Sequence, residues 1–532
     1  MSYTPPGPAI AYNGTGLTGG NSATENLNVY YDPGDQAYII VASAMVLIMV
    51  PGLGFLYSGL ARRKSALSMI WACMASCSVI TFQWYFWGYS LAFNPNATSG
   101  FIGNLESFGL MNVLGMPSPG SPLIPELLYA FYQMQFCAVT AAIVVGAIAE
   151  RGRLIPAMVF IFFWATLVYC PVACWVWNVS GWGFKYGVLD YAGGGPVEIV
   201  SGMSALAYSM VLGRRQEKMM LNFRPHNVSL ITLGTILLWF GWLGFNGGSA
   251  FGANLRAVMA CWNSNLTAMF GAATWVILDW RLARKWSMVG WCSGAISGLV
   301  AATPASGFIT PWASVALGIV TGLCCNFATK IKYWIKIDDA MDVFAEHGVA
   351  GMIGLLFNAI FAADYIIGLD GVNFSPDQSN STFWGGWIQH GWWRLYVQVA
   401  YIVACTAYAF VVSALIAYLI NLVPGLHLRA SEEAELLGMD DDQLGEFAYD
   451  YVEVRRDYLA WTPSKTDPEN HEHTVPQGER HGIPQHSEML EGREPSHNSG
   501  DDSSGGHAHT GIGGDRHGIA WEAKEKLRRS NH

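Results

Sequence analysis

Long apolar stretches alternate with short polar loops through most of this chain. Because a helix rises about 1.5 Å per residue, roughly 20 apolar residues cross a bilayer core about 30 Å thick. Eleven stretches of spanning length can be read, at residues 37–60, 65–93, 126–149, 154–178, 193–213, 227–250, 258–280, 287–304, 310–330, 341–364 and 391–424. The pattern predicts an all-α polytopic membrane protein with 11 transmembrane helices.

Two of these stretches repeat one plan. An apolar helix pattern begins at Asp190 and carries a lone carboxylate, Glu198, eight residues on, and a second begins at Asp339 and carries His347 at the same spacing. Eight helical residues advance about 12 Å, which places both side chains near the middle of the bilayer. Ionisable side chains are costly at that depth and indicate a substrate or proton path.

Composition and charge agree with a membrane protein and predict its orientation. The chain is 52% hydrophobic and 13% charged, and its net charge is −10. The acidity belongs to the C-terminal region, because 22 of the 39 acidic residues follow Gly425. Alternate loops, beginning with residues 61–64, hold 15 Lys and Arg, whereas the opposite loops hold three. The positive-inside rule then predicts an extracellular N-terminus and a cytoplasmic C-terminus.

Opposite directions of the two repeated stretches predict an inverted repeat. The fifth span, with Glu198, runs inward, and the tenth, with His347, runs outward. Spans 1–5 and 6–10 are therefore expected to be inverted halves that meet at a site near the midplane, with span 11 as an addition. The run from Gly193 to Pro196 lies at a helix start, where the backbone can bend beside a pore.

Polar segments flank the spans and divide the chain into four parts. We expect an extracellular N-terminal segment (1–35), a transmembrane domain (36–425), a cytoplasmic docking segment (426–460) and a cytoplasmic tail (461–532). The tail is rich in Pro, Gly, Ser, His and acidic residues, a composition that predicts disorder. Its serines are candidate targets of a regulatory kinase. Its nine histidines are irregularly spaced, so no metal site is predicted.

Smaller sequence features fit the same topology. Four glycosylation sequons fall on the predicted outer side, at Asn13, Asn96, Asn373 and Asn380. The ten cysteines lie inside apolar segments and predict packing residues rather than a disulfide framework. His226 and His390 lie at span ends and are interpreted as structural.

Three motifs together resemble the ammonium transporter (Amt/Mep/Rh) family. They are LDYAGGGPVE at 189–198, FGWLGFNGGS at 240–249 and IDDAMDVFAEHG at 337–348, and the similarity spans roughly residues 36–450. The resemblance implies eleven helices, an outer N-terminus and a homotrimer in the plasma membrane with one narrow pore per subunit. Residues 436–449 resemble the segment of this family that docks on the inner face and contacts neighbouring subunits.

The resemblance also assigns roles along the pore. An outer recruitment site would use Trp177, Ser249 and Tyr132. Below it would lie a stacked gate of Phe136 and Phe245, then Trp242 lining the pore. These assignments come from motif positions alone.

The same resemblance places a pair of pore histidines at positions 198 and 347. Here position 198 is Glu, which is similar to a fungal Mep subgroup that carries Glu there. Asp190 resembles a structurally required aspartate of the family. Asp339 and Asp342 resemble the acidic pair that precedes the second histidine.

Physical chemistry supports ammonium as the cargo of such a pore. An indole face beside a hydroxyl holds a small cation by cation–π attraction and a hydrogen bond. A dehydrated cation cannot cheaply cross an apolar tube, but ammonium can lose a proton and K⁺ cannot. Glu198 and His347 would then be polar partners for ammonia and carriers of the proton.

Two other functions remain open at this stage. The same pore could belong to an ammonium sensor whose tail reports occupancy, or to a gas channel for neutral ammonia. The spans contain no nucleophile–base set or metal cluster, so we expect no enzyme and no cofactor. The expected partners are ammonium or ammonia, methylammonium, the lipid bilayer, other copies of the chain and a kinase acting on the tail, but no nucleic acid.

Overall fold

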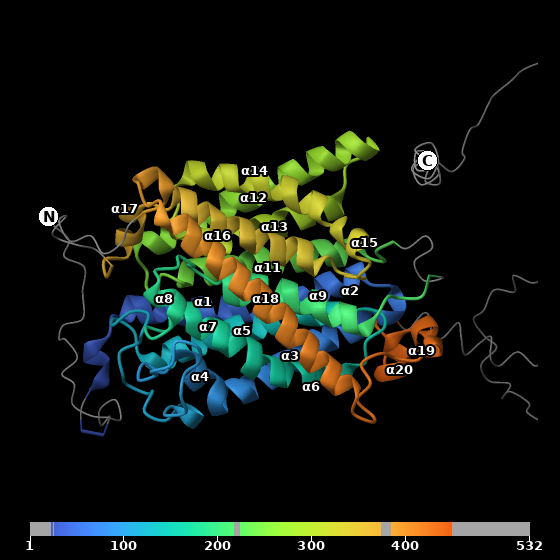
Figure 1. The fold of residues 1–532 in the computed structure, drawn as a ribbon, viewed down its shortest axis with the longest axis horizontal. Coiled ribbons are helices and arrows are strands. Elements are labelled where there is room, and N and C mark those ends of the chain that lie inside the picture. The colour runs from blue at the N-terminus through green and yellow to red at the C-terminus, as the bar shows by residue number, and fades with distance from the viewer. Residues whose placement is uncertain (1–22, 25, 218–223, 374–384, 450–532) are drawn as a thin grey trace, which may run out of the picture. The chain divides into compact units, whose positions relative to one another are not determined.

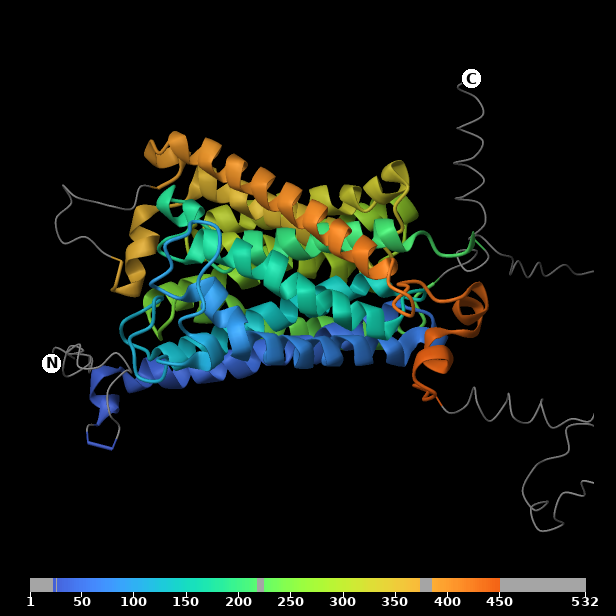
Figure 2. The ribbon, with the colours of Figure 1, turned by 60° about the horizontal axis from the view of Figure 1, so that its bottom comes forward.

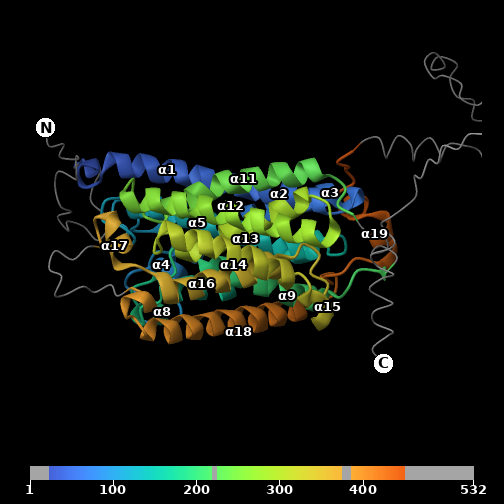
Figure 3. The same ribbon diagram turned by 90° about the horizontal axis from the view of Figure 1, so that it is seen from above.

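The computed structural model describes residues 23–24, 26–217, 224–373 and 385–449. These residues form helices joined by loops, with two isolated β-bridges, Pro117–Pro125 and Gly152–Arg429. The helices lie side by side in one bundle (Figure 1). Helices α1 (Pro33–Leu47) and α11 (Val228–Gly248) line one side, and α18 (Trp393–Asn421) lies on the opposite side (Figure 3). The predicted all-α fold is confirmed.

The first five predicted spans correspond to consecutive helices, some of which contain π-helical turns. In chain order they are α1 and α2 (Met49–Leu60); α3 (Ala66–Gln83), the π-helix η3 (Trp84–Gly88) and α4 (Tyr89–Phe93); α5 (Glu126–Val144) and the 3-10 helix η5 (Val145–Ile148); α6 (Leu154–Trp164), the π-helix η6 (Ala165–Tyr169), α7 (Cys170–Trp177) and α8 (Trp182–Lys185); and the π-helix η7 (Gly194–Ile199) with α9 (Val200–Leu212).

The later spans follow the same plan. They are α11; α12 (Leu255–Ala283); α13 (Met288–Ala305); α14 (Pro311–Ala328) with α15 (Ile331–Ile335); the π-helix η8 (Phe344–Val349) with α16 (Ala350–Phe361); and α18. Shorter helices complete the described chain: the 3-10 turns η1 (Leu27–Tyr30), η2 (Arg63–Ser65), η4 (Phe108–Leu110), η9 (Gly368–Asp370) and η11 (Trp387–Gln389), and α17 (Asp364–Ile367), α19 (Glu432–Leu437) and α20 (Met439–Gln443). Helix α18, drawn in orange, crosses the bundle obliquely (Figure 2).

Within the described residues, ten helical segments are long and apolar enough to span a membrane. They match ten of the eleven predicted spans. The remaining one, 258–280, corresponds to α12, which is 29 residues long but carries polar side chains. Asn263 explains why polarity is tolerated there, because its buried amide donates 2.8 Å hydrogen bonds to the carbonyls of Ser306 and Ile309.

The two repeated stretches begin differently from the sequence prediction. The helices start at Gly194 and Phe344, not at Asp190 and Asp339, so the estimate of depth from eight helical residues was wrong. Each start is preceded by a residue in the left-handed region, Gly193 (φ 116°) and Asp342 (φ 55°). Both of these residues lie five positions before an ionisable side chain, so the equivalence of the two stretches is retained.

The two aspartates explain these starts. Oδ1 of Asp190 accepts hydrogen bonds from the amides of Gly193 (2.9 Å) and Gly194 (2.6 Å), and Oδ2 accepts one from Gly195 (2.7 Å). Oδ2 of Asp339 accepts the amide of Phe344 (2.8 Å). A helix start leaves amides without partners, and a carboxylate satisfies several of them at once.

An ionic network joins the loops at the end of the bundle that the charge pattern predicts to be cytoplasmic. Arg215 bonds Oε2 of Glu150 (2.7 Å) and Oδ2 of Asp338 (2.8 Å), and Arg62 bonds the other oxygen of Glu150 (3.1 Å). Burial alone would raise the pKa of Asp338, but the Arg215 guanidinium, with Arg151 nearby, holds it well below its ordinary value. The Asp338 carboxylate therefore stays ionised, and paired with Arg215, at physiological pH.

The segment after α18 is bound to this same end (Figure 2). The Asp440 carboxylate accepts the amides of Leu67 (3.0 Å) and Ser68 (2.7 Å) at the start of α3. The Ala430 amide donates to the Arg151 carbonyl (2.9 Å). His226, interpreted as structural, approaches Tyr449 of this segment at 3.0 Å.

The tail, two of the sequons and the cysteines remain to be compared with their predictions. The predicted tail at 461–532, with its histidines and serines, and the sequons at Asn13 and Asn380 lie outside the described residues. All ten cysteines are described and are free thiols. The cysteines form no disulfide bonds in the structure.

Close backbone contact joins the two repeated stretches. A Cβ atom added to Gly202 of α9 would lie 2.4 Å from the amide nitrogen of Gly348 and 2.5 Å from its Cα. A Cβ added to Gly351 would lie 2.7 Å from the Cβ of Glu198. Small residues allow this approach where lipid supplies no hydrophobic drive between helices.

We predict that Gly202→Ala lowers stability by about 1 to 3 kcal/mol, because the added methyl group must push α9 away from η8. The midpoint of thermal unfolding in detergent would measure this. Gly100→Ala is the control, because the nearest atoms to its added Cβ are 3.4 Å away. Equal midpoints for the two variants would contradict the tight contact.

Candidate functional site

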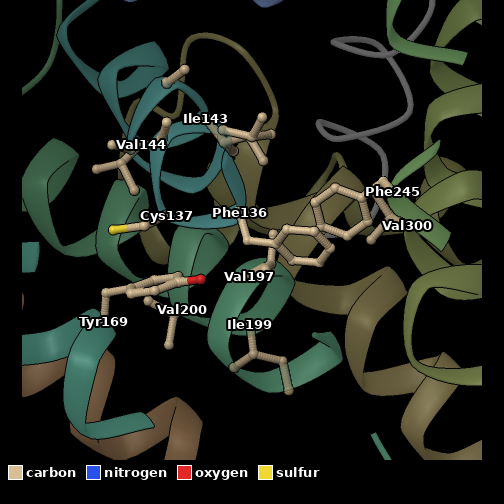
Figure 4. Packing of buried hydrophobic residues seen from close by; sticks show 14 of the residues in the cluster. Phe136, Cys137, Ile143, Val144, Tyr169, Val197, Ile199, Val200, Phe245 and Val300 are labelled. Carbon is tan, nitrogen blue, oxygen red and sulfur yellow. The ribbon is translucent and has the colours of Figure 1, made fainter. Parts of the chain in front are cut away.

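Two stacked phenyl rings lie in the interior of the bundle. Phe136 of α5 and Phe245 of α11 have ring centroids 3.8 Å apart and ring planes 20° from parallel. Both side chains are almost wholly buried. Figure 4 shows the two rings face to face, with aliphatic side chains around them. The structure thus brings together the two residues predicted to form a gate.

The three predicted recruitment residues surround this ring pair. The indole of Trp177 is partly exposed, and its ring meets Phe136 edge-on at 6.2 Å between centroids. Ser249 Oγ donates to the Phe245 carbonyl (2.8 Å) and lies 3.4 Å from the Tyr132 hydroxyl. The indole therefore borders one residue of the ring pair and the hydroxyl bonds the other.

Tyr132 differs from Trp177 because it is wholly buried. Its single O–H donates to the Phe245 carbonyl (2.6 Å), with the Gly244 carbonyl 3.0 Å from the same oxygen, and its ring packs on Phe136 at 4.9 Å. Tyr132 thus holds both members of the ring pair in place. Its contact with a cation stays a prediction.

An acid and an imidazole are bonded to each other deeper in the bundle. Oε2 of Glu198 and Nδ1 of His347 are 2.8 Å apart, and both side chains are buried. They come from the equivalent π-helices η7 and η8, so the predicted meeting of the two stretches is observed. Oε1 of Glu198 has no hydrogen-bond partner among the described residues. It can therefore accept or donate a further hydrogen bond.

Trp242 connects the ring pair with the acid–imidazole pair. Its centroid is 6.1 Å from that of Phe245 and 6.5 Å from that of His347, with indole and imidazole planes 21° from parallel. Trp177, the ring pair, Trp242 and the acid–imidazole pair thus form one series of neighbouring side chains. The series leads from a partly exposed indole to two buried ionisable groups.

The aspartates of the predicted site lie outside this series. Asp190 caps η7, and its own carbonyl accepts the Trp177 indole N–H (3.2 Å), so it fixes both ends of the series. Asp339 caps η8, and Asp342 pairs with Lys332 (2.7 Å). Their observed contacts are structural ones.

Three supporting residues were missed by sequence reasoning. Tyr401 of α18 reaches Oδ2 of Asp190 (3.3 Å), and Asn358 of α16 bonds the carbonyls of Leu189 (2.8 Å) and Pro304 (2.6 Å). Thr303 of α13 accepts the Trp242 indole N–H (2.9 Å). These residues could have been found from the sequence as polar side chains inside apolar spans, because a buried polar group needs a hydrogen-bond partner. In the described part of the chain, no group of three or more His, Cys, Asp or Glu side chains is placed to hold a metal ion.

Comparisons of the sequence and of the structure both find similarity to ammonium transporters. Residues 37–449 match the Ammonium Transporter Family. Ammonium transporter MEP3 of Saccharomyces cerevisiae is 56% identical over 432 residues, which are 81% of this chain and 86% of the relative. The crystal structure of Candida albicans Mep2 superposes with a TM-score of 0.75 at 44% identity and covers 86% of this chain and 97% of that one. A structure described as a Sensor Amt Protein gives a TM-score of 0.68 at 27% identity, with 77% and 98% covered.

The capping role of Asp190 predicts a graded loss of stability. Asp190→Ala should lower the free energy of unfolding by several kcal/mol, because three buried amides lose their acceptor at about 1 to 3 kcal/mol each. Asp190→Asn keeps one carbonyl oxygen and should cost less. Thermal unfolding in detergent tests the order, with Asp364→Ala, at an exposed aspartate that begins the short helix α17, as control. An Ala variant as stable as the Asn variant would contradict the capping role.

Proposed function

The chain belongs to the ammonium transporter family, and from this premise we propose that it takes up ammonium with high specificity across the plasma membrane. The observation that carries the proposal is the order of the side chains. An indole with a nearby hydroxyl comes first, then an apolar ring pair, then an acid bonded to an imidazole. Each member meets one physical requirement for moving ammonium but not K⁺.

Recruitment uses the partly exposed indole of Trp177 and the buried hydroxyl of Ser249. The indole face attracts a cation, worth about 1 to 2 kcal/mol when partly desolvated, and Ser249 Oγ accepts a hydrogen bond from ammonium. Such binding is weak, which suits a carrier that must release its cargo. K⁺ would be attracted by the indole too, so selectivity must arise further along.

The ring pair supplies the selective barrier. Two phenyl rings 3.8 Å apart offer no hydrogen-bond acceptor, so a bare cation between them would lose its solvation without replacement. Ammonium passes this barrier as neutral ammonia, and the proton that it gives up is transferred to the Glu198–His347 pair. K⁺ has no neutral form and stays outside.

The Glu198–His347 pair handles the proton and the ammonia. The two groups share one short contact, so a proton held by one is also hydrogen-bonded by the other. Oε1 of Glu198 remains available to bond ammonia or to pass a proton on. We propose that ammonia and the proton travel by linked routes and recombine on the inner side, which gives net electrogenic uptake.

Orientation and assembly complete the proposal. The N-terminus is extracellular and the C-terminus cytoplasmic, supported by 15 Lys and Arg in one set of loops and three in the other. Three copies form a homotrimer in the lipid bilayer, as the family resemblance implies. Kinase action on serines of the tail would regulate transport.

A sensor that binds ammonium in the same pore and reports its occupancy through the tail is the second candidate. The bound segment of residues 426–449 favours it, because the Arg62–Glu150–Arg215–Asp338 network links its docking surface to the residue that precedes Asp339. A gas channel for neutral ammonia is the nearest mechanistic alternative. A gas channel would carry no current, so electrical recording separates it from our proposal.

Expression in cells that lack their own ammonium transporters tests the function. Labelled methylammonium should enter, saturate with concentration and be displaced by ammonium but not by K⁺. In liposomes, ammonium should evoke a current that grows with an inside-negative voltage. Protein at the cell surface without uptake would leave only the sensor, and uptake without current would favour the gas channel.

Glu198 should set the pH dependence of transport. Glu198→His is expected to shift the pH profile of the ammonium current and to lower K⁺ leakage, because the carboxylate, which favours a cation, is replaced by a second imidazole. Solid-supported membrane recordings between pH 5 and 8 would measure both. Glu126→Gln is a matched control, because Glu126 is a buried acid bonded to Tyr89 outside this series. An unchanged pH profile would remove the proposed role of Glu198.

A further inference from the structure

Thr303 is a polar side chain that the pore scheme does not use. It is wholly buried in α13 and lies one residue before Pro304, near the end of that helix. Its hydroxyl donates to the Leu299 carbonyl (3.1 Å) and accepts the Trp242 indole N–H (2.9 Å). The single donor of the hydroxyl is thus satisfied within its own helix, and a lone pair is directed to Trp242. The hydroxyl also faces the Glu198 carboxylate.

This hydrogen bond restrains the orientation of Trp242. An indole has one donor and no acceptor, and a buried N–H without a partner is costly. Trp242 is almost wholly buried, so turning its ring away would require another acceptor for the N–H. With Thr303 in place, the indole plane lies 21° from that of His347 and its centroid 6.1 Å from that of Phe245.

Thr303 is itself fixed relative to both halves of the site. Its carbonyl accepts the amide of Ala192 (3.0 Å), and the Pro304 carbonyl accepts that of Tyr191 (3.1 Å), both in the loop that opens η7. Asn358 of α16, beyond η8, also bonds the Pro304 carbonyl (2.6 Å). The hydroxyl therefore occupies a rigid point between the segments that carry Glu198 and His347.

We propose that Thr303 is a positioning residue that determines selectivity through Trp242. Thr303 holds the indole plane nearly parallel to the His347 imidazole. The indole then keeps the region between the ring pair and the acid–imidazole pair narrow and apolar. Release of the indole widens this space and admits water, so K⁺ is excluded less well. This inference rests on the proposed function.

Four variants test the inference: Thr303→Val, Thr303→Ser, Trp242→Phe and the double variant Thr303→Val with Trp242→Phe. Val keeps the shape of Thr but loses the acceptor, Ser keeps the acceptor, and Phe removes the indole N–H. The readouts are the ratio of K⁺ to ammonium current and the pH profile of the ammonium current, recorded from purified protein in liposomes. Thermal unfolding in detergent reports whether each variant is folded.

Thr303→Val should raise the K⁺-to-ammonium current ratio by about fivefold or more, the factor that corresponds to one lost buried hydrogen bond. It should also change the pH profile. Thr303→Ser should stay within about twofold of the parent. The double variant should match Trp242→Phe alone, because Thr303 acts through the indole N–H.

Three results would overturn the inference: a folded Thr303→Val with the selectivity and pH profile of the parent, a Ser variant altered as much as the Val variant, or additive effects in the double variant. If Thr303→Val does not fold, Trp242→Phe decides, and parental selectivity in that variant overturns the inference. A parent protein that carries no ammonium would instead disprove the proposed function, so the two failures are distinguishable.

Discussion

A carboxylate and an imidazole bonded at 2.8 Å inside an apolar bundle require two helices to approach almost to backbone contact. Gly202 and Gly348 make this approach possible, because neither leaves a side chain between the chains. The cost of burying two ionisable groups is offset only while they remain partners. The packing of the two halves and the chemistry of the site therefore depend on one contact.

The same contact explains the local helix geometry. Glu198 and His347 both lie in π-helical turns, each five residues after a residue in the left-handed region and eight after a capping aspartate. A π-helical turn is less regular than an α-helical one and is often found at functional sites. Its presence at equivalent places in both stretches indicates that the two halves position their ionisable side chains with the same local backbone geometry.

The sequence predicted the spans and the pairing of Glu198 with His347, because hydrophobic length and repeated spacing are local signals. It placed the helix starts at Asp190 and Asp339, because the sequence does not distinguish a carboxylate that caps a helix from several residues before it from an ordinary first helical residue. It did not find Thr303, since the acceptor of an indole N–H 61 positions away depends on tertiary packing. The roles of Trp177, Ser249 and Tyr132 as cation ligands came from resemblance, and geometry shows only that they lie close together.

The docked segment after α18 also has a mechanical consequence. Asp440 occupies two successive amides at the first turn of α3, so detaching it would leave both without acceptors at the same moment. The position of this segment and the first turn of α3 are therefore coupled, because the segment supplies acceptors that the helix start lacks.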